Sequence, residues 1–99
     1  LGDFSSDDIV LSSLALGCMG DAYMELGDVE AALDSYASAV SNSSNDFTAP
    51  RYIMKQALIH DANGDSDKAL NLYKSIKNDY KTSREANGIE KYIAKVENS

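Results

Sequence analysis

The chain has few of the residues on which small proteins build covalent or metal-dependent chemistry. Its 99 residues include no tryptophan, one proline, one histidine and one cysteine. A lone cysteine excludes both an intrachain disulfide and a zinc site made of cysteine ligands. No apolar run reaches the roughly 18 residues that cross a bilayer, so this segment is expected not to insert into a membrane.

Basic residues are missing from the first half of the chain. Residues 1–50 contain nine acidic residues and no Lys or Arg, whereas all nine basic residues lie in residues 51–99, and the net charge is −7. An acidic chain repels phosphate backbones, so nucleic acid is not an expected partner. The division of charge favours head-to-tail contact between copies, which leaves self-association open.

Recognisable catalytic motifs are also absent, since the sequence has no Gly-rich phosphate loop, nucleophile elbow or H-E-x-x-H. Asp21 and Glu25 lie four apart on one predicted helix face, where a solvated pair is favoured over an acid–base pair. The neighbour of His60, Asp61, projects about 100° away from it on a helix, which favours a structural histidine. Cys18 has no basic neighbour and is predicted to be buried and inert. We therefore expect no enzyme, no cofactor and no metal site.

What the chain does contain is a copy of one segment 37 residues further on. The equivalent positions are Gly20 and Ala57, Gly27-Asp28 and Gly64-Asp65, Ala32-Leu33 and Ala69-Leu70, and Tyr36 and Tyr73. A fixed period of this size indicates one supersecondary unit that is copied and stacked.

Apolar residues at helical spacing predict that both units are helical hairpins. Ser5 and Asp8 are typical of a helix start, and the first helix is predicted near residues 7–26. Its apolar stripe consists of Leu11, Leu14, Ala15, Cys18, Ala22 and Leu26. A turn at Gly27-Asp28 leads to a second helix, whose stripe consists of Val29, Ala32, Leu33, Tyr36, Ala39 and Val40.

The second half is predicted to repeat this pattern and add one helix. Ser41 to Asp46 is a loop by composition, and Thr48 caps a third helix at 49–62 with Pro50 in its first turn. A fourth helix follows Gly64-Asp65 and ends near Asn78. A capping box, Thr82-Ser83-Arg84-Glu85, predicts a fifth helix over 84–97 that contains Gly88, a residue that weakens helices. Its stripe is Ile89, Tyr92, Ile93 and Val96.

Small and large residues alternate where these helices should meet. Gly20, Ala32 and Ala39 permit close approach, while Tyr23, Leu33 and Tyr36 fill the volume around them. Tyr23 and Tyr36 are therefore predicted to be largely buried, Ala32 to contact the facing helix, and Asp34 to face solvent.

These residues resemble the tetratricopeptide repeat, whose signature is a small residue, an aromatic residue, a Gly-Asp turn, then Ala, an aromatic residue and Ala. The first copy is Gly20, Tyr23, Gly27-Asp28, Ala32, Tyr36 and Ala39. The second departs at His60, in place of the aromatic residue, and at Ile76, in place of the last Ala. The resemblance implies one all-α domain over 1–99, a right-handed helical solenoid of two hairpins, about 13–46 and 50–83, plus a capping helix at about 84–97.

A looser resemblance concerns the parent protein. The run from Asn45 to Pro50 and the segment Gly88 to Ile93 look like the C-terminal region of larger bacterial repeat proteins that are tethered to the inner membrane and face the periplasm. That resemblance, with a start at Leu1 and fewer than about three repeats, implies a fragment of a longer chain. The periplasmic side of the envelope and the cytoplasm both remain open as locations.

The family resemblance also implies a site. The first helix of each repeat lines a concave groove, which here would consist of Leu14, Gly17, Asp21, Met24, Glu25, Arg51, Met54, Leu58 and Asp61. This groove would make the chain a non-enzymatic module that binds a protein partner through a peptide or helical segment. Equally, the same residues could pack against another repeat, which is the structural alternative. The family's carboxylate clamp would need Lys and Asn at Gly17 and Asp21 and Asn at Lys55, so that docking activity is not expected.

Overall fold

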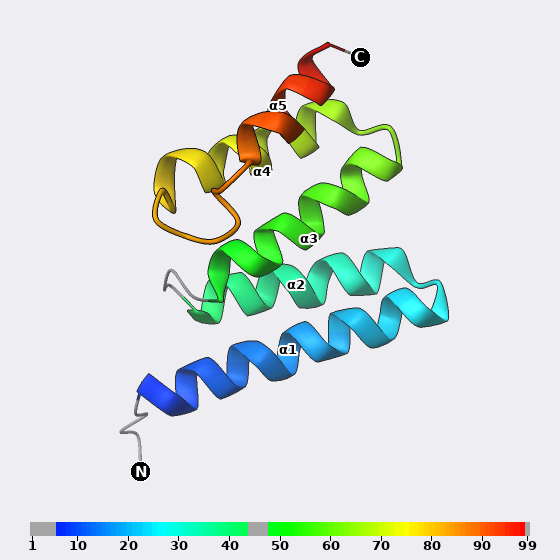
Figure 1. The fold of residues 1–99 in the computed structure, drawn as a ribbon. Helices are drawn as coiled ribbons and strands as arrows, with labels where there is room; N and C mark the ends of the chain where they lie inside the picture. The colour runs from blue at the N-terminus through cyan, green and yellow to red at the C-terminus, as the bar shows by residue number, and fades with distance from the viewer. Residues whose placement is uncertain (1–5, 44–47, 99) are drawn as a thin grey trace.

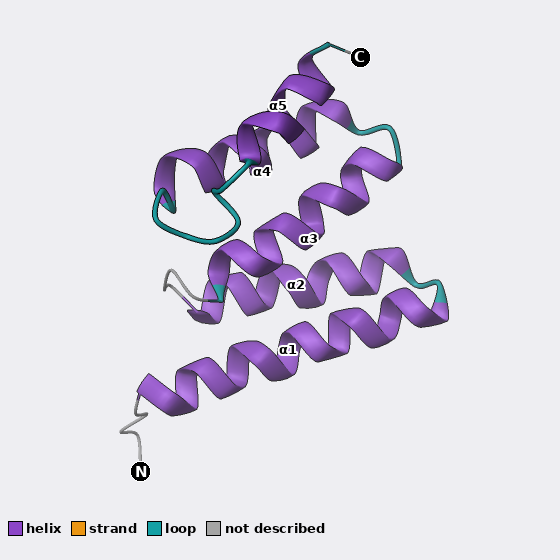
Figure 2. Cartoon of the chain, in the orientation of Figure 1, coloured by secondary structure: helices purple, strands orange, loops and turns teal. Residues whose placement is uncertain are grey.

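Five α-helices make up the computed structural model, which describes residues 6–43 and 48–98, and no strand occurs in those two ranges (Figures 1 and 2). This all-α architecture confirms the predicted fold class. None of the described helices is long and apolar enough to cross a membrane. The helices are α1 (Ser6–Leu26), α2 (Val29–Ser43), α3 (Ala49–Ala62), α4 (Ser66–Asp79) and α5 (Ile89–Glu97).

The first four helices form two antiparallel hairpins with the same turn (Figure 1). Gly27 and Gly64 adopt left-handed conformations, with φ of 81° and 82°, which a residue without Cβ adopts at little cost. The next residue closes each turn, since the Asp28 amide donates to the Tyr23 carbonyl at 2.9 Å and the Asp65 amide to the His60 carbonyl at 2.8 Å. The two predicted Gly-Asp turns are confirmed.

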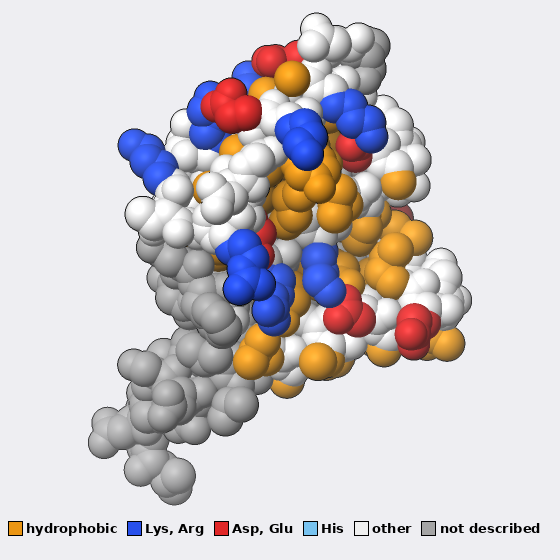
Figure 3. All heavy atoms as spheres, in the orientation of Figure 1, with side chains coloured by type: hydrophobic (Ala, Val, Ile, Leu, Met, Phe, Trp, Pro, Cys, Tyr) orange, Lys and Arg blue, Asp and Glu red, His pale blue; other side chains and the backbone are white. Residues whose placement is uncertain are grey.

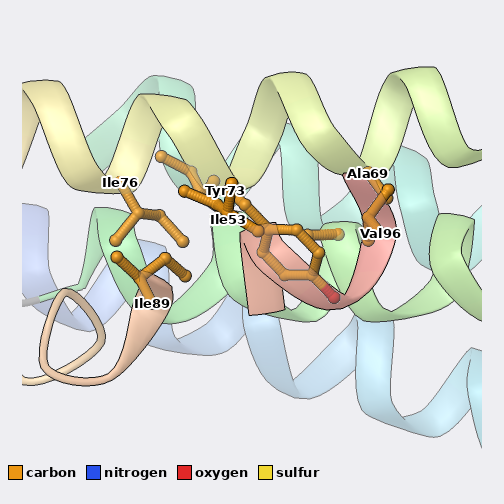
Figure 4. Packing of buried hydrophobic residues seen from close by; sticks show 8 residues of the cluster. Ile53, Ala69, Tyr73, Ile76, Ile89 and Val96 are labelled. Carbon is orange, nitrogen blue, oxygen red and sulfur yellow. The ribbon is translucent and has the colours of Figure 1, made fainter. Parts of the chain in front are cut away.

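The helices stack in chain order, α2 against α3 and α4 against α5, around two hydrophobic clusters. One cluster lies among α3, α4 and α5, as Figure 4 shows for Tyr73 and the isoleucines around it, and consists of Ile53, Ala57, Ala69, Tyr73, Ile76, Ile89, Ile93 and Val96. The other joins α2 to α3 and consists of Ala32, Tyr36, Ala39, Tyr52 and Ile59. Because α3 contributes to both clusters, it couples the two hairpins.

The segment between the hairpins differs from the predicted loop. Helix α2 runs on to Ser43, so the prediction of a loop from Ser41 is wrong. The side chain of Asn42 donates to the Ser38 carbonyl at 2.9 Å, which ties it to the preceding helical turn. Thr48 occupies the N-cap position of α3 with proline in the first turn, as predicted, but its side chain makes no capping hydrogen bond. The rest of the loop, 44–47, and the Ser5 start signal lie outside the described residues.

The capping box does not open the fifth helix at residue 84. Ser83 accepts a hydrogen bond from the Ala86 amide at 3.1 Å and donates one to the Tyr80 carbonyl at 2.7 Å, so it stabilises a turn. The helix begins at Ile89, after Gly88 in a left-handed conformation with φ of 81°. Gly88 is therefore the N-cap of α5, because a residue with positive φ cannot belong to a right-handed α-helix. Since Gly88 lies before the helix, it does not weaken its interior.

The rotation of α1 about its axis differs most from expectation. From residue 12 on, where the burial of α1 is described, its buried positions are Ser13, Gly17 and Gly20. Four residues of the predicted apolar stripe are exposed, so the predicted stripe and the prediction of a buried cysteine are wrong; these residues are Ala15, Cys18, Ala22 and Leu26. Tyr23 is only half-buried, whereas Tyr36 and Ala32 are buried as predicted. The physical reason is close approach: the Ser13 hydroxyl donates to the Ala39 carbonyl at 2.7 Å, and only small side chains allow α1 and α2 to come so near.

Candidate functional site

A polar cluster joins the two hairpins on the surface that α1 and α3 share. The Tyr36 hydroxyl, from α2, donates a hydrogen bond to Asp21 on α1. Lys55 of α3 lies with its Nζ 2.7 Å from Asp21 Oδ1 and 5.6 Å from the centre of the Tyr36 ring. One carboxylate therefore receives a hydroxyl and an ammonium group from two other helices, which fixes the relative position of all three.

The electrostatics of this cluster favour a charged Asp21. Partial burial by itself would raise the pKa of Asp21, but hydrogen bonds from Lys55 and Tyr36 and the positive charges of Lys55 and Arg51 lower it below the ordinary value of 3.8. The same geometry acts on the phenol: burial and the hydrogen bond to Asp21 raise the pKa of Tyr36. The cluster therefore keeps a charged Asp21 beside Lys55 and a neutral phenol at neutral pH.

Two glycines bring the aromatic rings of this junction against α1. A Cβ atom on Gly17 would lie 2.1 Å from the Tyr52 ring, and one on Gly20 would lie 2.5 Å from the Tyr36 ring. The rings of Tyr36 and Tyr52 stack at 5.9 Å between centroids with an interplanar angle of 14°. The glycines are thus required for close contact, and the Tyr36 ring of the stacked pair lies beneath Lys55.

The second junction uses the equivalent tyrosine but a different partner. The Tyr73 hydroxyl, on α4, donates to Asp61 Oδ2 of α3 at 3.2 Å. Its ring lies 5.5 Å from that of Tyr92 on α5, tilted by 32°. Burial, and after it the charge of Asp61, raises the pKa of Tyr73 to about 12. Each hairpin therefore uses the tyrosine at the same position of its repeat to connect a carboxylate with an aromatic ring of another helix.

The 37-residue period reveals how the two junctions differ at the surface. Leu58 follows Asp21 by one period, and Tyr92 follows Lys55. The ion pair of the first junction is thus replaced by two apolar side chains, which are 43% and 37% exposed. Figure 3 shows hydrophobic side chains gathered in the middle of this face, with Lys and Arg around them and acidic side chains near α1. The surface therefore combines two neighbouring parts: a charged step, Asp21 and Lys55, and an apolar step, Leu58 and Tyr92.

The structure places the nine predicted groove residues in three environments. Met24 is 38% exposed, and Gly17 is buried beneath the Tyr52 ring, so it contributes only through that ring. Leu14, Met54 and Asp61 are half-buried. Exposed, like Met24, are Asp21, Glu25, Arg51 and Leu58.

Sequence reasoning missed the parts that Tyr36, Tyr52, Lys55 and Tyr92 take in this surface. The signal that could have found them is the period itself. Shifting Tyr52 and Lys55 of α3 by 37 residues gives Ile89 and Tyr92 of α5, so one buried and one surface-facing position recur on these two helices. The contact across the hairpin junction, in contrast, needs the tertiary arrangement.

His60 occupies a packing position in the second hairpin. It is half-buried, and its Nδ1 atom has no hydrogen-bond partner and lies 3.6 Å from Asp65 Oδ2. Asp61, its neighbour in sequence, is engaged by Tyr73 instead. Within the described ranges, no three His, Cys, Asp or Glu residues come together in a way that could hold a metal ion.

The chain is a helical-repeat protein. It consists of repeated antiparallel hairpins with a Gly-Asp turn in each, and α3 contributes to the hydrophobic clusters of both hairpins. The family model for the tetratricopeptide repeat matches residues 19–46 and 52–83, more than half of the chain. The chain therefore belongs to the tetratricopeptide repeat family, whose members in general mediate protein–protein interactions and are not enzymes. The comparisons found no matching curated protein and no matching solved structure.

Proposed function

We propose that the chain is a non-enzymatic interaction module that binds a peptide or helical segment of a protein partner on the surface shared by α1, α3 and α5. The observation that carries this proposal is the pairing of a charged step, Asp21 and Lys55, with an apolar step, Leu58 and Tyr92. A segment that follows this surface would meet a polar region and then an apolar one. Such alternation allows one register of binding to be distinguished from another.

Three properties of the surface support peptide binding. Met24 and Leu58 offer exposed apolar side chains, and methionine adapts its shape to different partners. The stacked tyrosines beneath Lys55 keep the polar step in place, which reduces the entropy lost on binding. Asp21 and Lys55 neutralise each other, so the acidic charge of α1 at this surface falls mainly on Glu25.

The proposal is tested by selecting peptides from a displayed random library on the purified chain and measuring the affinity of the enriched sequences by fluorescence anisotropy. Leu58→Glu places a charge in the apolar step without removing buried volume, and it should weaken the selected peptides by about tenfold or more. Amide chemical shifts should then change around Met24, Lys55, Leu58 and Tyr92.

A matched control is Ala37→Glu, which adds the same charge at an exposed position of α2. It should leave the affinity within about twofold, since rim charges act weakly at a distance. If no peptide is enriched, or if Leu58→Glu and Ala37→Glu have equal effects, binding at this surface is disproved.

The structural alternative, in which the domain extends a solenoid, is favoured by a different observation. The side of α1 that faces away from α2 is apolar and exposed. That side is separate from the surface of α1, α3 and α5, so both roles can coexist.

A further inference from the structure

The side of α1 that faces away from α2 carries an uncharged apolar strip, here called the outer stripe, of five residues. All five are exposed, and they recur at spacings of three and four, which places them on one side of a helix. Figure 1 shows α1 at the lower edge of the molecule with no described helix beneath it, and Figure 3 shows hydrophobic side chains along that edge. The residues of the outer stripe are Ala15, Cys18, Met19, Ala22 and Leu26.

The 37-residue period shows what the same side does in the other two odd-numbered helices. Ala15 corresponds to Tyr52 of α3 and to Ile89 of α5. Tyr52 is buried in the cluster with α2, and Ile89 in the cluster with α4. In α3 and α5, therefore, this position packs against the helix that precedes it in the stack.

A second position of the stripe gives the same result. Ala22 corresponds to Ile59 of α3 and to Val96 of α5. Ile59 is buried against α2, and Val96 is buried against α4. The outer stripe thus continues an interface that the structure forms twice, but no described helix covers it on α1.

The opposite end of the stack is closed differently. On α5, the positions one period after the buried Ile53 and Ala57 are Glu90 and Ala94, which are exposed. Glu90 pairs with Lys77 at 2.7 Å, so this side of α5 is polar and hydrated. Terminal helices of repeat proteins need such a polar outer side for solubility. The α1 side lacks it, which distinguishes a closed end from an open one.

We propose that the outer stripe is a docking surface for an amphipathic α-helix of a partner, which packs antiparallel to α1 as α2 packs on α3. The stripe has Ala15 and Ala22 where α3 has Tyr52 and Ile59. A partner helix must therefore present large apolar side chains to fill the space that small ones leave. This surface is independent of the peptide-binding surface proposed above.

Charge defines the rest of the partner's chemistry. The hairpin formed by α1 and α2 contains no Lys or Arg, and Glu25 and Asp28 are exposed at its turn. A partner helix with Lys or Arg beside its apolar side is attracted to this hairpin, whereas a second copy would bring two acidic hairpins together. A copy that approached head to tail would instead present the outer side of α5, where Glu90 and Ala94 lie in place of large apolar side chains. The proposed occupant is thus a basic amphipathic helix of a partner.

The probe for this surface is a synthetic helical peptide of about 18 residues with Leu on one side and Lys and Gln elsewhere. Titrated into the isotope-labelled chain, it should shift the amides of Ala15, Cys18, Met19 and Ala22. At saturation it should slow the reaction of Cys18 with a thiol reagent by about fivefold or more, because a docked helix covers that thiol. A peptide with Ala in place of Leu should bind at least about tenfold more weakly.

Two matched variants isolate the stripe from overall charge. Ala22→Lys places a cation in the stripe, and Ala37→Lys adds the same charge at an exposed site on α2. Only Ala22→Lys should abolish the Cys18 protection. A third variant, Met19→Gln, adds no charge and replaces an exposed residue, so it should fold even if the lysine variant does not. It should weaken binding of the peptide by about threefold to tenfold.

Three results would overturn the proposal. Shifts that centre on Met24 and Leu58 would place the peptide on the α1, α3 and α5 surface instead. Equal effects of Ala22→Lys and Ala37→Lys would show attraction to net charge alone. Concentration-dependent shifts of the stripe without peptide, lost in Ala22→Lys, would make the stripe an interface between copies of this chain.

Discussion

Asp21 is the residue on which most of the polar structure between the hairpins depends. It accepts hydrogen bonds from both Tyr36 and Lys55, and its own side chain remains half exposed. The pair with Lys55 is therefore screened by water and contributes modestly, as exposed ion pairs do. Asp21 acts mainly on the arrangement of the helices. Because its carboxylate accepts hydrogen bonds from α2 and α3, it restricts how those helices rotate relative to α1.

Asp21→Asn should reduce the free energy of unfolding at neutral pH by about 0.5–1 kcal/mol. Because the folded chain lowers the pKa of Asp21, this contribution is present above 3.8 and is lost as the pH falls through the folded value. The native chain should therefore lose stability in acid more steeply than the variant. Urea titrations at a series of pH values measure the difference, and a difference that stays constant down to strong acid would contradict the assignment.

Tyr73 gives the corresponding prediction at high pH. Its pKa is raised from 10.0 to about 12, so its contribution to stability is complete below pH 10 and is lost as the pH rises through about 12. Tyr73→Phe should remove one tyrosine from the late part of the ultraviolet absorbance titration. It should also cost about 0.5–1.5 kcal/mol at neutral pH through loss of the hydroxyl contact with Asp61. An unchanged late phase would show that Tyr73 ionises normally.

Ala32 tests the packing of α2. It is completely buried, whereas Asp34, two residues later, is exposed. Ala32→Leu should overpack the hairpin contact and cost about 1–3 kcal/mol. Asp34→Ala should change stability by no more than about 0.5 kcal/mol. Thermal unfolding followed by circular dichroism compares the two variants, and equal effects would disprove the assigned rotation of α2.

At the scale of the elements, each helix boundary is decided by a different local interaction. The Gly-Asp turns end α1 and α3 with the same backbone hydrogen bonds. The boundary of α5 depends instead on Gly88, since the capping box before it forms only a turn around Ser83. A strong capping pattern is thus not sufficient to start a helix when the tertiary structure directs the chain elsewhere.

Gly88→Ala measures the strength of that boundary. A Cβ atom at this position would meet nothing within 4 Å, so the cost comes from the backbone conformation alone. We expect a loss of about 1 kcal/mol, because positive φ is unfavourable for a residue with a Cβ. Gly88→Asn should lose less, since Asn adopts this conformation more readily. Denaturant unfolding that ranked Asn below Ala would contradict the left-handed N-cap.

At the scale of the whole molecule, α3 contributes to both hydrophobic clusters and so couples one hairpin to the other. Tyr52 and Ile59 pack toward α2, while Ile53 and Ala57 pack toward α4. The α5 helix then covers the end of the second cluster with Ile89, Ile93 and Val96 (Figure 4). In such a stack, stability is shared between neighbouring units, and a loss at one end spreads through their contacts.

Ile93→Ala should therefore destabilise the entire chain by about 2–4 kcal/mol, because it leaves a cavity against α4. Its matched control is Lys91→Ala on the exposed side of α5, which should stay within about 0.5 kcal/mol. Hydrogen exchange should show that protection falls in α1 and α2 as well as in α5. Two separate unfolding transitions would show that α3 does not couple the hairpins.

The sequence by itself determined the fold class, the two Gly-Asp turns and the burial of Ala32 and Tyr36. These features are local or periodic: a left-handed glycine ends a helix wherever it stands, and a copied unit must pack against its copy. The family was also evident from Gly20, Tyr23, Gly27-Asp28 and Ala32 at their characteristic spacing, and the family match over residues 19–46 and 52–83 confirms it.

Only the tertiary structure decided which side of α1 is buried. The helix is apolar on nearly every side, so its pattern fits burial of Cys18 as well as burial of Gly17. The contact with Tyr36 and Tyr52 selects the side with glycines, because their rings need the space that a Cβ would occupy. The pairing of Asp21 with Lys55, 34 residues away, likewise depends on how the hairpins stack. Packing between distant segments resolves alternatives that local periodicity leaves equal in energy.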